Sequence, residues 1–89
     1  MFAMSWGAEG IAQASSEFQD VETAADLLCA SVERAALYGV SQVAGTAYQD
    51  AAEMLAEGMR SEGRAALSAG RDWRQESGPV WVWLFPRRA

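Results

Sequence analysis

Histidine and lysine are absent from this 89-residue sequence, and cysteine occurs once, as Cys29. Histidine is the usual acid–base group and metal ligand near neutral pH, so its absence removes most common catalytic constellations and zinc sites. A single cysteine cannot form a disulfide within the chain, which favours a reducing, cytoplasmic location. Asp50 and Glu53 lie on one face of a predicted helix and are expected to be ordinary surface acids. Cys29 follows Leu28 beside the apolar positions, so it is expected to be a small buried residue and not a reactive thiol. We therefore expect a protein that is not an enzyme and holds no metal and no cofactor.

Long hydrophobic runs are also missing. The densest one, Val80 to Phe85, has six residues, whereas a membrane-spanning helix needs about 20. The first four residues carry no basic group, and Glu9 interrupts the region where a signal peptide has its apolar core. The sequence therefore predicts neither a transmembrane span nor a targeting segment.

One sign of charge dominates each part of the chain. Residues 1–57 contain nine acids and one arginine, and residues 58–89 contain three acids and six arginines, within a net charge of −5. Nucleic-acid binding needs a concentrated basic face, so we expect none. The separation suits antiparallel pairing of acidic and basic stretches, within one chain or between chains, although each exposed pair contributes only roughly tenths of a kcal/mol. The residues expected to lie side by side are Glu17, Asp20, Glu22 and Asp26 with Arg60, Arg64, Arg71 and Arg74.

What the chain does contain is an alanine-rich pattern between residues 15 and 76, in which apolar residues recur every three to four positions, as on one face of a helix. Ser16 and Gln19 fit a capping box, so the first helix is expected over about 16–38. Glycines at 39 and 45 predict a turn, with one bent helix as the alternative. The second helix is expected over about 45–76, ending at Gly78 and Pro79.

Three glycines fall inside the second predicted helix, at positions 58, 63 and 70, and each costs about 1 kcal/mol relative to alanine. Either two backbones approach each other closely there or the helix must bend, or else the helix is marginal and orders on binding.

The resulting fold prediction is an all-α, two-helix antiparallel hairpin in a single domain, residues 1–89. It consists of a lead-in (1–14), the hairpin (15–77) and a tryptophan-rich, non-helical tail (78–89). Alanine side chains contribute little buried area, so the hairpin is expected to be completed by oligomerisation or by a partner, for example as a four-helix arrangement of two hairpins. The expected interaction stripe comprises Phe18, Val21, Leu28, Val32, Tyr48, Leu55, Met59 and Trp73.

The tail is the second candidate for an interaction site. If it is extended, Trp81, Trp83 and Phe85 point to one side and the intervening aliphatic residues to the other. Tryptophan favours apolar–water boundaries, and the following Arg87 and Arg88 can pair with anionic headgroups or acidic protein. The tail is therefore expected to anchor the chain to a surface or partner, or else to fold back on the hairpin.

Residues from Ala25 to Ala69 resemble the core of the phasin family, which coats polyhydroxyalkanoate granules. The positions that carry this resemblance are Leu28, Val32, Ala35, Ala36, Gly39, Gln42, Tyr48, Glu57, Gly58 and the run from Ala65 to Ala69. The length and hairpin layout of the chain also resemble those of the helical hairpins secreted by type VII systems. In this resemblance, Trp73 lies near the position at which that family has its exit signal.

The phasin resemblance implies a non-enzymatic amphipathic coat or scaffold protein. Such a protein binds an apolar granule or a peripheral membrane surface, or associates with itself. The alternative is a small subunit of a larger complex, including a type VII-like hairpin, that docks on a protein partner through its stripe and its aromatic tail.

Overall fold

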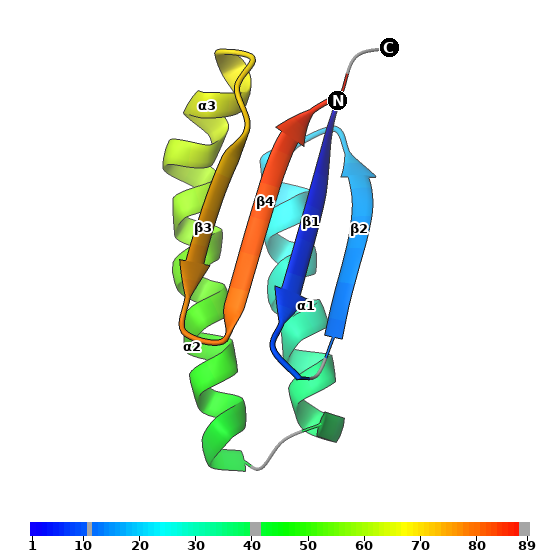
Figure 1. The fold of residues 1–89 in the computed structure, drawn as a ribbon, viewed down its shortest axis with the longest axis vertical. Coiled ribbons are helices and arrows are strands. Elements are labelled where there is room, and N and C mark those ends of the chain that lie inside the picture. Colours follow the sequence, from blue (N-terminus) through cyan, green and yellow to red (C-terminus); the bar gives the residue numbers. More distant parts are fainter. Residues whose placement is uncertain (11, 40–41, 88–89) are drawn as a thin grey trace.

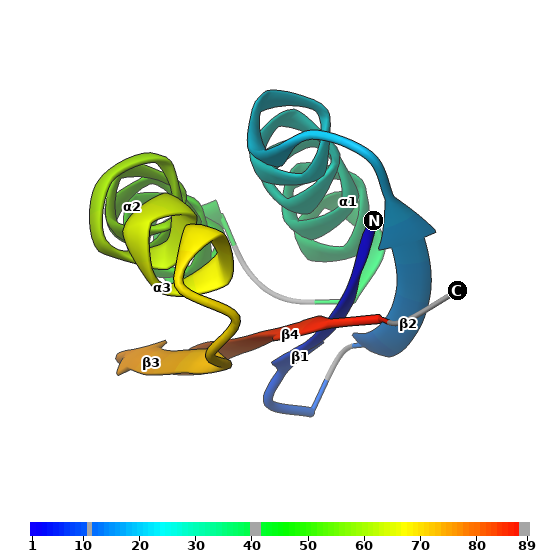
Figure 2. The same cartoon turned by 90° about the horizontal axis from the view of Figure 1, so that it is seen from above.

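The computed structural model describes residues 1–10, 12–39 and 42–87, and it shows a two-layer arrangement of helices on a sheet (Figures 1 and 2). In chain order the elements are β1 (Phe2–Ala8), β2 (Ala12–Phe18), α1 (Val21–Gly39), α2 (Gln42–Gly58), the π-helical turn η1 (Met59–Gly63), α3 (Arg64–Ser68), β3 (Trp73–Ser77) and β4 (Val80–Pro86). The strands form one antiparallel sheet in the order β2-β1-β4-β3. The segments α2, η1 and α3 follow one another without a break, and this long helix lies with α1 on one face of the sheet.

The prediction of an all-α helical hairpin is therefore wrong. The expected lead-in forms β1 and the start of β2, the end of the second predicted helix forms β3, and the expected tail forms β4. The two central strands, β1 and β4, come from opposite ends of the chain and pair from Phe2 with Pro86 to Ala8 with Val80. Such pairing depends on contacts between distant residues, which helical periodicity in the middle of the chain does not report.

Turn chemistry explains where the second helix stops. Gly70 has a φ of +75°, a left-handed conformation that favours glycine. The N–H of Arg71 donates to the carbonyl of Ala66, and the N–H of Gly70 donates to Leu67, which is the hydrogen-bonding pattern of a Schellman C-terminal motif. The helix thus ends at Ser68, and the five residues from Trp73 are free to form a strand.

The Gly78–Pro79 pair, expected to terminate a helix, is instead the two-residue loop of the β3–β4 hairpin, because Ser77 pairs with Val80. Gly78 has a φ of +55° at the first loop position, and proline fixes φ at the second, as suits a type II′ turn. The N–H of Glu9 donates to the carbonyl of Pro79 over 2.7 Å, which ties the two hairpin turns together.

The core lies between the helices and the inner face of the sheet. Leu28 and Val32 from α1, and Leu55 and Met59 from the long helix, are fully buried. They meet inward residues of the central strands, namely Phe2, Met4, Trp6, Val80, Val82 and Leu84. The alanine-rich stripe is thus covered by the chain's own sheet, so the expected need for an oligomer or partner to complete the core does not arise from these residues.

Glycines in the long helix make room for one indole. A Cβ on Gly58 would lie 3.0 Å from two ring atoms of Trp73, and a Cβ on Gly63 would lie 3.2 Å from a third. In an α-helix, residues five apart point in different directions, but the wider turn of η1 brings both glycines toward Trp73. At Gly58 and Gly63 the approaching group is thus a side chain of β3, and not a second backbone as expected, while Gly70 lies beyond the end of the helix.

Candidate functional site

None of the described helices covers the sheet face that points away from α1 and the long helix, and we call this face the open face (Figure 2). Strand alternation places on it the residues between the inward-facing core positions. These are Gln13, Ser15 and Glu17 of β2, Ala3, Ser5 and Gly7 of β1, Trp81, Trp83 and Phe85 of β4, and Arg74 and Glu76 of β3. A row of three aromatic side chains thus runs along the middle of the open face.

Trp81 lies over Gly7 of the neighbouring strand. A Cβ on Gly7 would come within 2.4–2.8 Å of three atoms of the indole, so only glycine admits the ring in this position. The ring covers the backbone of β1, and 37% of Trp81 remains exposed. An aromatic side chain packed on a cross-strand glycine is a known way of stabilising a sheet, and it also fixes the direction of the ring.

Trp83 is held by three neighbours. Its indole N–H donates to the Asp72 carboxylate over 2.9 Å, and the Arg74 guanidinium lies 5.6 Å from its ring centre, within cation–π range. The ring of Phe85 packs at a tilt with centroids 4.7 Å apart. Trp83 is nevertheless 36% exposed, so an oriented aromatic surface faces outward here.

An open hollow of about 580 Å³ lies beside the two tryptophans, toward the β3 edge. Arg74 pairs with Trp83 across the strands, and Glu76 pairs with Trp81, so a cation and an anion stand next to each other along this side of the aromatic row. Neither charge takes part in an ion pair with another described residue. At the opposite edge of the face, Arg87 and Glu17 pair with each other over 3.2 Å.

The charge of the open face bears on the kind of partner it suits. Its described charged groups are Arg74 and Arg87 against Glu17, Glu76 and the adjoining Asp72, so positive charge is not in excess. Stacking of nucleic-acid bases on aromatic side chains is accompanied by a positively charged groove in the proteins that use it. The described part of this face has no such groove.

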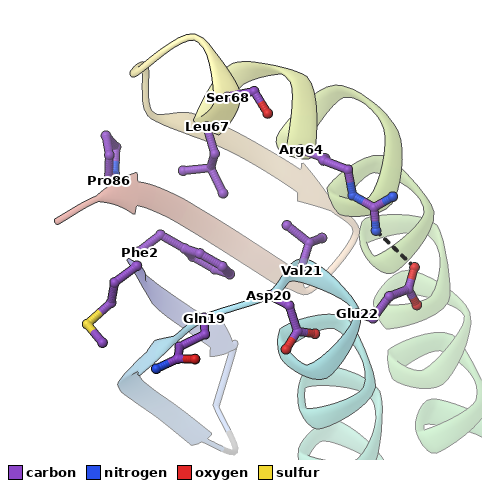
Figure 3. Close-up of a pocket in the computed structure, with 10 residues that line it drawn as sticks. Phe2, Gln19, Asp20, Val21, Glu22, Arg64, Leu67, Ser68 and Pro86 are labelled. Carbon is purple, nitrogen blue, oxygen red and sulfur yellow. Dashed lines mark hydrogen bonds and ion pairs between the residues drawn. The ribbon is translucent and has the colours of Figure 1, made fainter.

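A second hollow, of about 400 Å³, lies where α1 begins, between α3 and the ends of the strands (Figure 3). Asp20 caps α1 by accepting the Thr23 N–H over 2.7 Å, and this backbone hydrogen bond, with a second from the Thr23 hydroxyl, lowers the pKa of the carboxyl. The helix thus begins at Val21 with Asp20 as its cap, not near Ser16, which lies in β2.

Ion pairs join the two helices beside this hollow. Arg64 contacts Glu22 at 3.0 Å, as Figure 3 shows. Arg60 contacts both Glu22 and Asp26, at 3.0 and 2.9 Å. Antiparallel pairing of acids with arginines, expected from the charge pattern, therefore occurs for these four residues, within the chain. Because the carboxylates are already occupied by arginines, we assign this region a structural role.

The eight stripe residues lie in or around the core. Val21, Leu28, Val32, Leu55 and Met59 are buried, and Phe18, Tyr48 and Trp73 are partly buried against them. The Tyr48 hydroxyl also donates to the Glu9 carbonyl over 2.6 Å. The structure thus brings the stripe together, but as the interior of one chain.

The anchor residues have a different position. Trp81, Trp83 and Phe85 share the open face, as the alternation of an extended segment predicts, while Arg87 pairs with Glu17. Arg88 lies outside the described residues. Sequence reasoning missed Gly7 and Glu76, and it expected Arg74 beside the acids of the first helix, whereas Arg74 pairs with Trp83 in the sheet. The alternation from Trp73 to Ser77, directly before a Gly–Pro turn, is a strand signal that could have revealed the positions of Arg74 and Glu76.

The described residues offer little for catalysis or metal binding. They include no group of three or more potential metal ligands. Burial raises the pKa of the Cys29 thiol, the sulfur of which lies 3.8 Å from the Ala52 carbonyl oxygen, so the thiol is a poor nucleophile near neutral pH. Within the same part of the chain, no helix combines the length and apolarity needed to cross a membrane.

Comparison with protein-family models, with curated proteins and with solved structures finds no match for this chain. The helical hairpin implied by the phasin and type VII resemblances is not its fold. The function must therefore be argued from the open face.

Proposed function

We propose that this chain is a non-enzymatic protein-binding domain whose binding surface is the open face of its sheet. One observation carries the proposal: Trp81 and Trp83 lie side by side on a sheet face that no helix covers, each more than one-third exposed. Tryptophan is enriched among the residues that contribute most to protein interfaces, because it buries a large area and has a polar N–H at its edge.

Contacts within the chain orient both indoles, which favours binding. Gly7 provides the seat for Trp81, and Asp72 and Arg74 hold Trp83. Ordering a mobile side chain on association costs about 0.5–1.5 kcal/mol, and side chains that are already fixed avoid much of that cost. The open face thus presents aromatic rings that are already oriented toward a partner.

The surface also specifies the chemistry of its partner. The partner must present an apolar patch to the aromatic row, and beside it an acidic group for Arg74 and a basic group for Glu76, about two strand residues apart. A protein surface can offer both signs at that spacing. An anionic membrane surface offers one sign only, and the described charges of this face provide no net attraction for it. The small-subunit alternative is thereby kept, with docking through the aromatic row instead of the alanine stripe.

Site-specific photo-crosslinking in cells that make the protein tests this proposal. We would replace Trp83 by the photoreactive aromatic p-benzoylphenylalanine and, as the matched control, Met54, which is 61% exposed in the helical layer. We expect adducts with a protein, identified by mass spectrometry, from position 83 and not from position 54. Adducts from neither position, or equally from both, would overturn the proposal. Recovery of the position-83 variant on lipid vesicles or polymer beads without a protein adduct would instead support a granule or membrane surface.

A further inference from the structure

Resting on the proposed function, we infer that the protein bound by the open face is a second copy of this chain. The two sheets pack face to face about a twofold axis that lies in the interface, at right angles to the strands. The open face itself has the properties required of its partner: an apolar row with one acidic and one basic group beside it, two strand residues apart.

Strand register sets out the face as two neighbouring cross-strand rungs. The first rung contains Arg74 and Trp83, and the second contains Glu76 and Trp81. On β1 the rungs continue with Ser5 and Gly7, which present little side chain above the sheet. Each rung therefore has a charged side chain on β3, at the edge of the sheet, and a tryptophan on β4. The two rungs differ in the sign of the charge.

The proposed twofold axis is perpendicular to the strands and passes between the two rungs. It therefore places the first rung of one copy opposite the second rung of the other. Arg74 then faces Glu76 of the second copy, and Glu76 faces Arg74, so two symmetric ion pairs form together. Trp83 of each copy likewise faces Trp81 of the other. Stacked sheets lie about 10 Å apart, a separation that arginine and glutamate side chains reaching from both sides can span. Stacking on Trp83 leaves the N–H groups of the Arg74 guanidinium available for this pairing.

The other in-plane axis, parallel to the strands, gives a poorer match. It places β3 opposite β2 of the second copy, so Arg74 faces Ser15 and Glu76 faces Gln13, and neither charge is paired. The same operation brings Glu17 near Asp72 of the second copy, where two acids repel. Charge complementarity therefore selects the perpendicular axis.

The size of the face predicts a reversible dimer. Around the perpendicular axis the two faces overlap over the five residues from Val80 to Leu84 and their strand partners. Five residues are about 17 Å long, so four strands about 4.8 Å apart present about 330 Å² on each copy. Two such faces bury about 660 Å², which is below the roughly 1,200 Å² of stable specific interfaces and corresponds to weak, transient association. We therefore expect a weak monomer–dimer equilibrium with a Kd in the range of about 10 μM to 1 mM, in which the orientation depends on the charge pairs.

Charge-reversal variants test the inference, measured by sedimentation velocity over a dilution series. In Arg74→Glu, glutamate faces Glu76 of the other copy, and in Glu76→Arg, arginine faces Arg74, so each variant should dimerise about tenfold or more weakly. An equimolar mixture of the two should recover dimerisation as a heterodimer, because every facing pair is then of opposite sign. The double variant Arg74→Glu/Glu76→Arg should recover it as a homodimer.

Arg34→Glu and Glu33→Arg are the matched controls, because they make the same charge changes on exposed positions of α1, in the helical layer. We expect both to dimerise like the original chain. Circular dichroism should show that all variants remain folded, since Arg74 and Glu76 are exposed.

A chain that stays monomeric to about 1 mM, or variants that fail to complement each other when mixed, would overturn the inference. The proposed function is judged separately: position-83 adducts with a different protein would leave it standing while this inference fails. An adduct joining two copies, together with complementation in the mixture, supports both.

Discussion

Replacing Gly7 by alanine tests the structure of the open face at its tightest contact. The added Cβ would lie 2.4, 2.6 and 2.8 Å from three indole atoms of Trp81, distances that two heavy atoms do not tolerate. Because the indole is at the surface, it can rotate away from β1 instead of forcing the strand out of the sheet. We expect Gly7→Ala to fold with Trp81 displaced from its seat.

The magnitude follows from two opposing terms. Alanine in place of glycine favours the strand by about 0.5–1 kcal/mol, because less backbone entropy is lost on folding. Displacing the indole exposes about 100 Å² of apolar surface, which at about 25 cal/mol per Å² costs about 2.5 kcal/mol. The net expectation is a free energy of unfolding lower by about 1.5–2 kcal/mol, measured by urea denaturation.

A double-mutant cycle with Trp81→Ala isolates the contact. When Trp81 is already alanine there is no ring to displace. Gly7→Ala should then leave the free energy of unfolding unchanged, or raise it by about 0.5–1 kcal/mol, which is what alanine contributes in a strand relative to glycine. The coupling between the two positions should therefore be about 2 kcal/mol. Additive effects of the two substitutions, or a Gly7→Ala protein as stable as the original, would refute the placement of Trp81 over Gly7.

Three further predictions concern the helical layer. Gly63→Ala should destabilise the protein by about 1 kcal/mol in urea despite its better helix propensity, because the new Cβ would lie 3.1 Å from a methyl group of the fully buried Leu84; a gain in stability would contradict the contact. The hydrogen bonds from Thr23 lower the pKa of Asp20 in the folded state. The ionised Asp20 carboxylate therefore stabilises the fold at pH values above its unfolded pKa of about 4, and this stabilisation is lost as the pH falls through the lower folded pKa. Asp20→Asn, which keeps a capping oxygen, should remove that part of the acid dependence of the melting temperature, and an unaltered profile would argue against the cap. Cys29 should react slowly with a disulfide reagent at pH 8 in the native protein and rapidly in urea, since burial raises its pKa; equal rates would mean that the thiol is exposed.

Helices were the predictable part of the fold, because the apolar spacing between residues 15 and 76 is local information. Their ends were less predictable. Asp20, and not Ser16, caps α1, and Gly70, and not Gly78, ends the long helix. In both cases several residues had the required chemistry, and tertiary structure decided which one was used.

The sheet could not be derived in the same way. Its central pair joins β1 to β4, and the stability of each depends on the presence of the other. Residues of β3 continued the helical spacing by chance, since Trp73 falls one turn after Ala69. The alternation of β4 did predict correctly that Trp81, Trp83 and Phe85 would share one face. The charged residues beside them and the glycine beneath Trp81 come from strands that were not expected, so the open face could not be assembled from the sequence.

Copies of this chain associate through the open face, and not through the helical layer. The four indole N–H signals in a ¹H–¹⁵N NMR spectrum test this association directly, because Trp81 and Trp83 lie on the open face while Trp6 and Trp73 lie toward the helices. As the protein concentration rises from about 10 μM to about 1 mM, we expect the signals of Trp81 and Trp83 to shift progressively and the signals of Trp6 and Trp73 to stay in place. Shifts confined to Trp6 and Trp73, or four signals that do not move over this range, would contradict it.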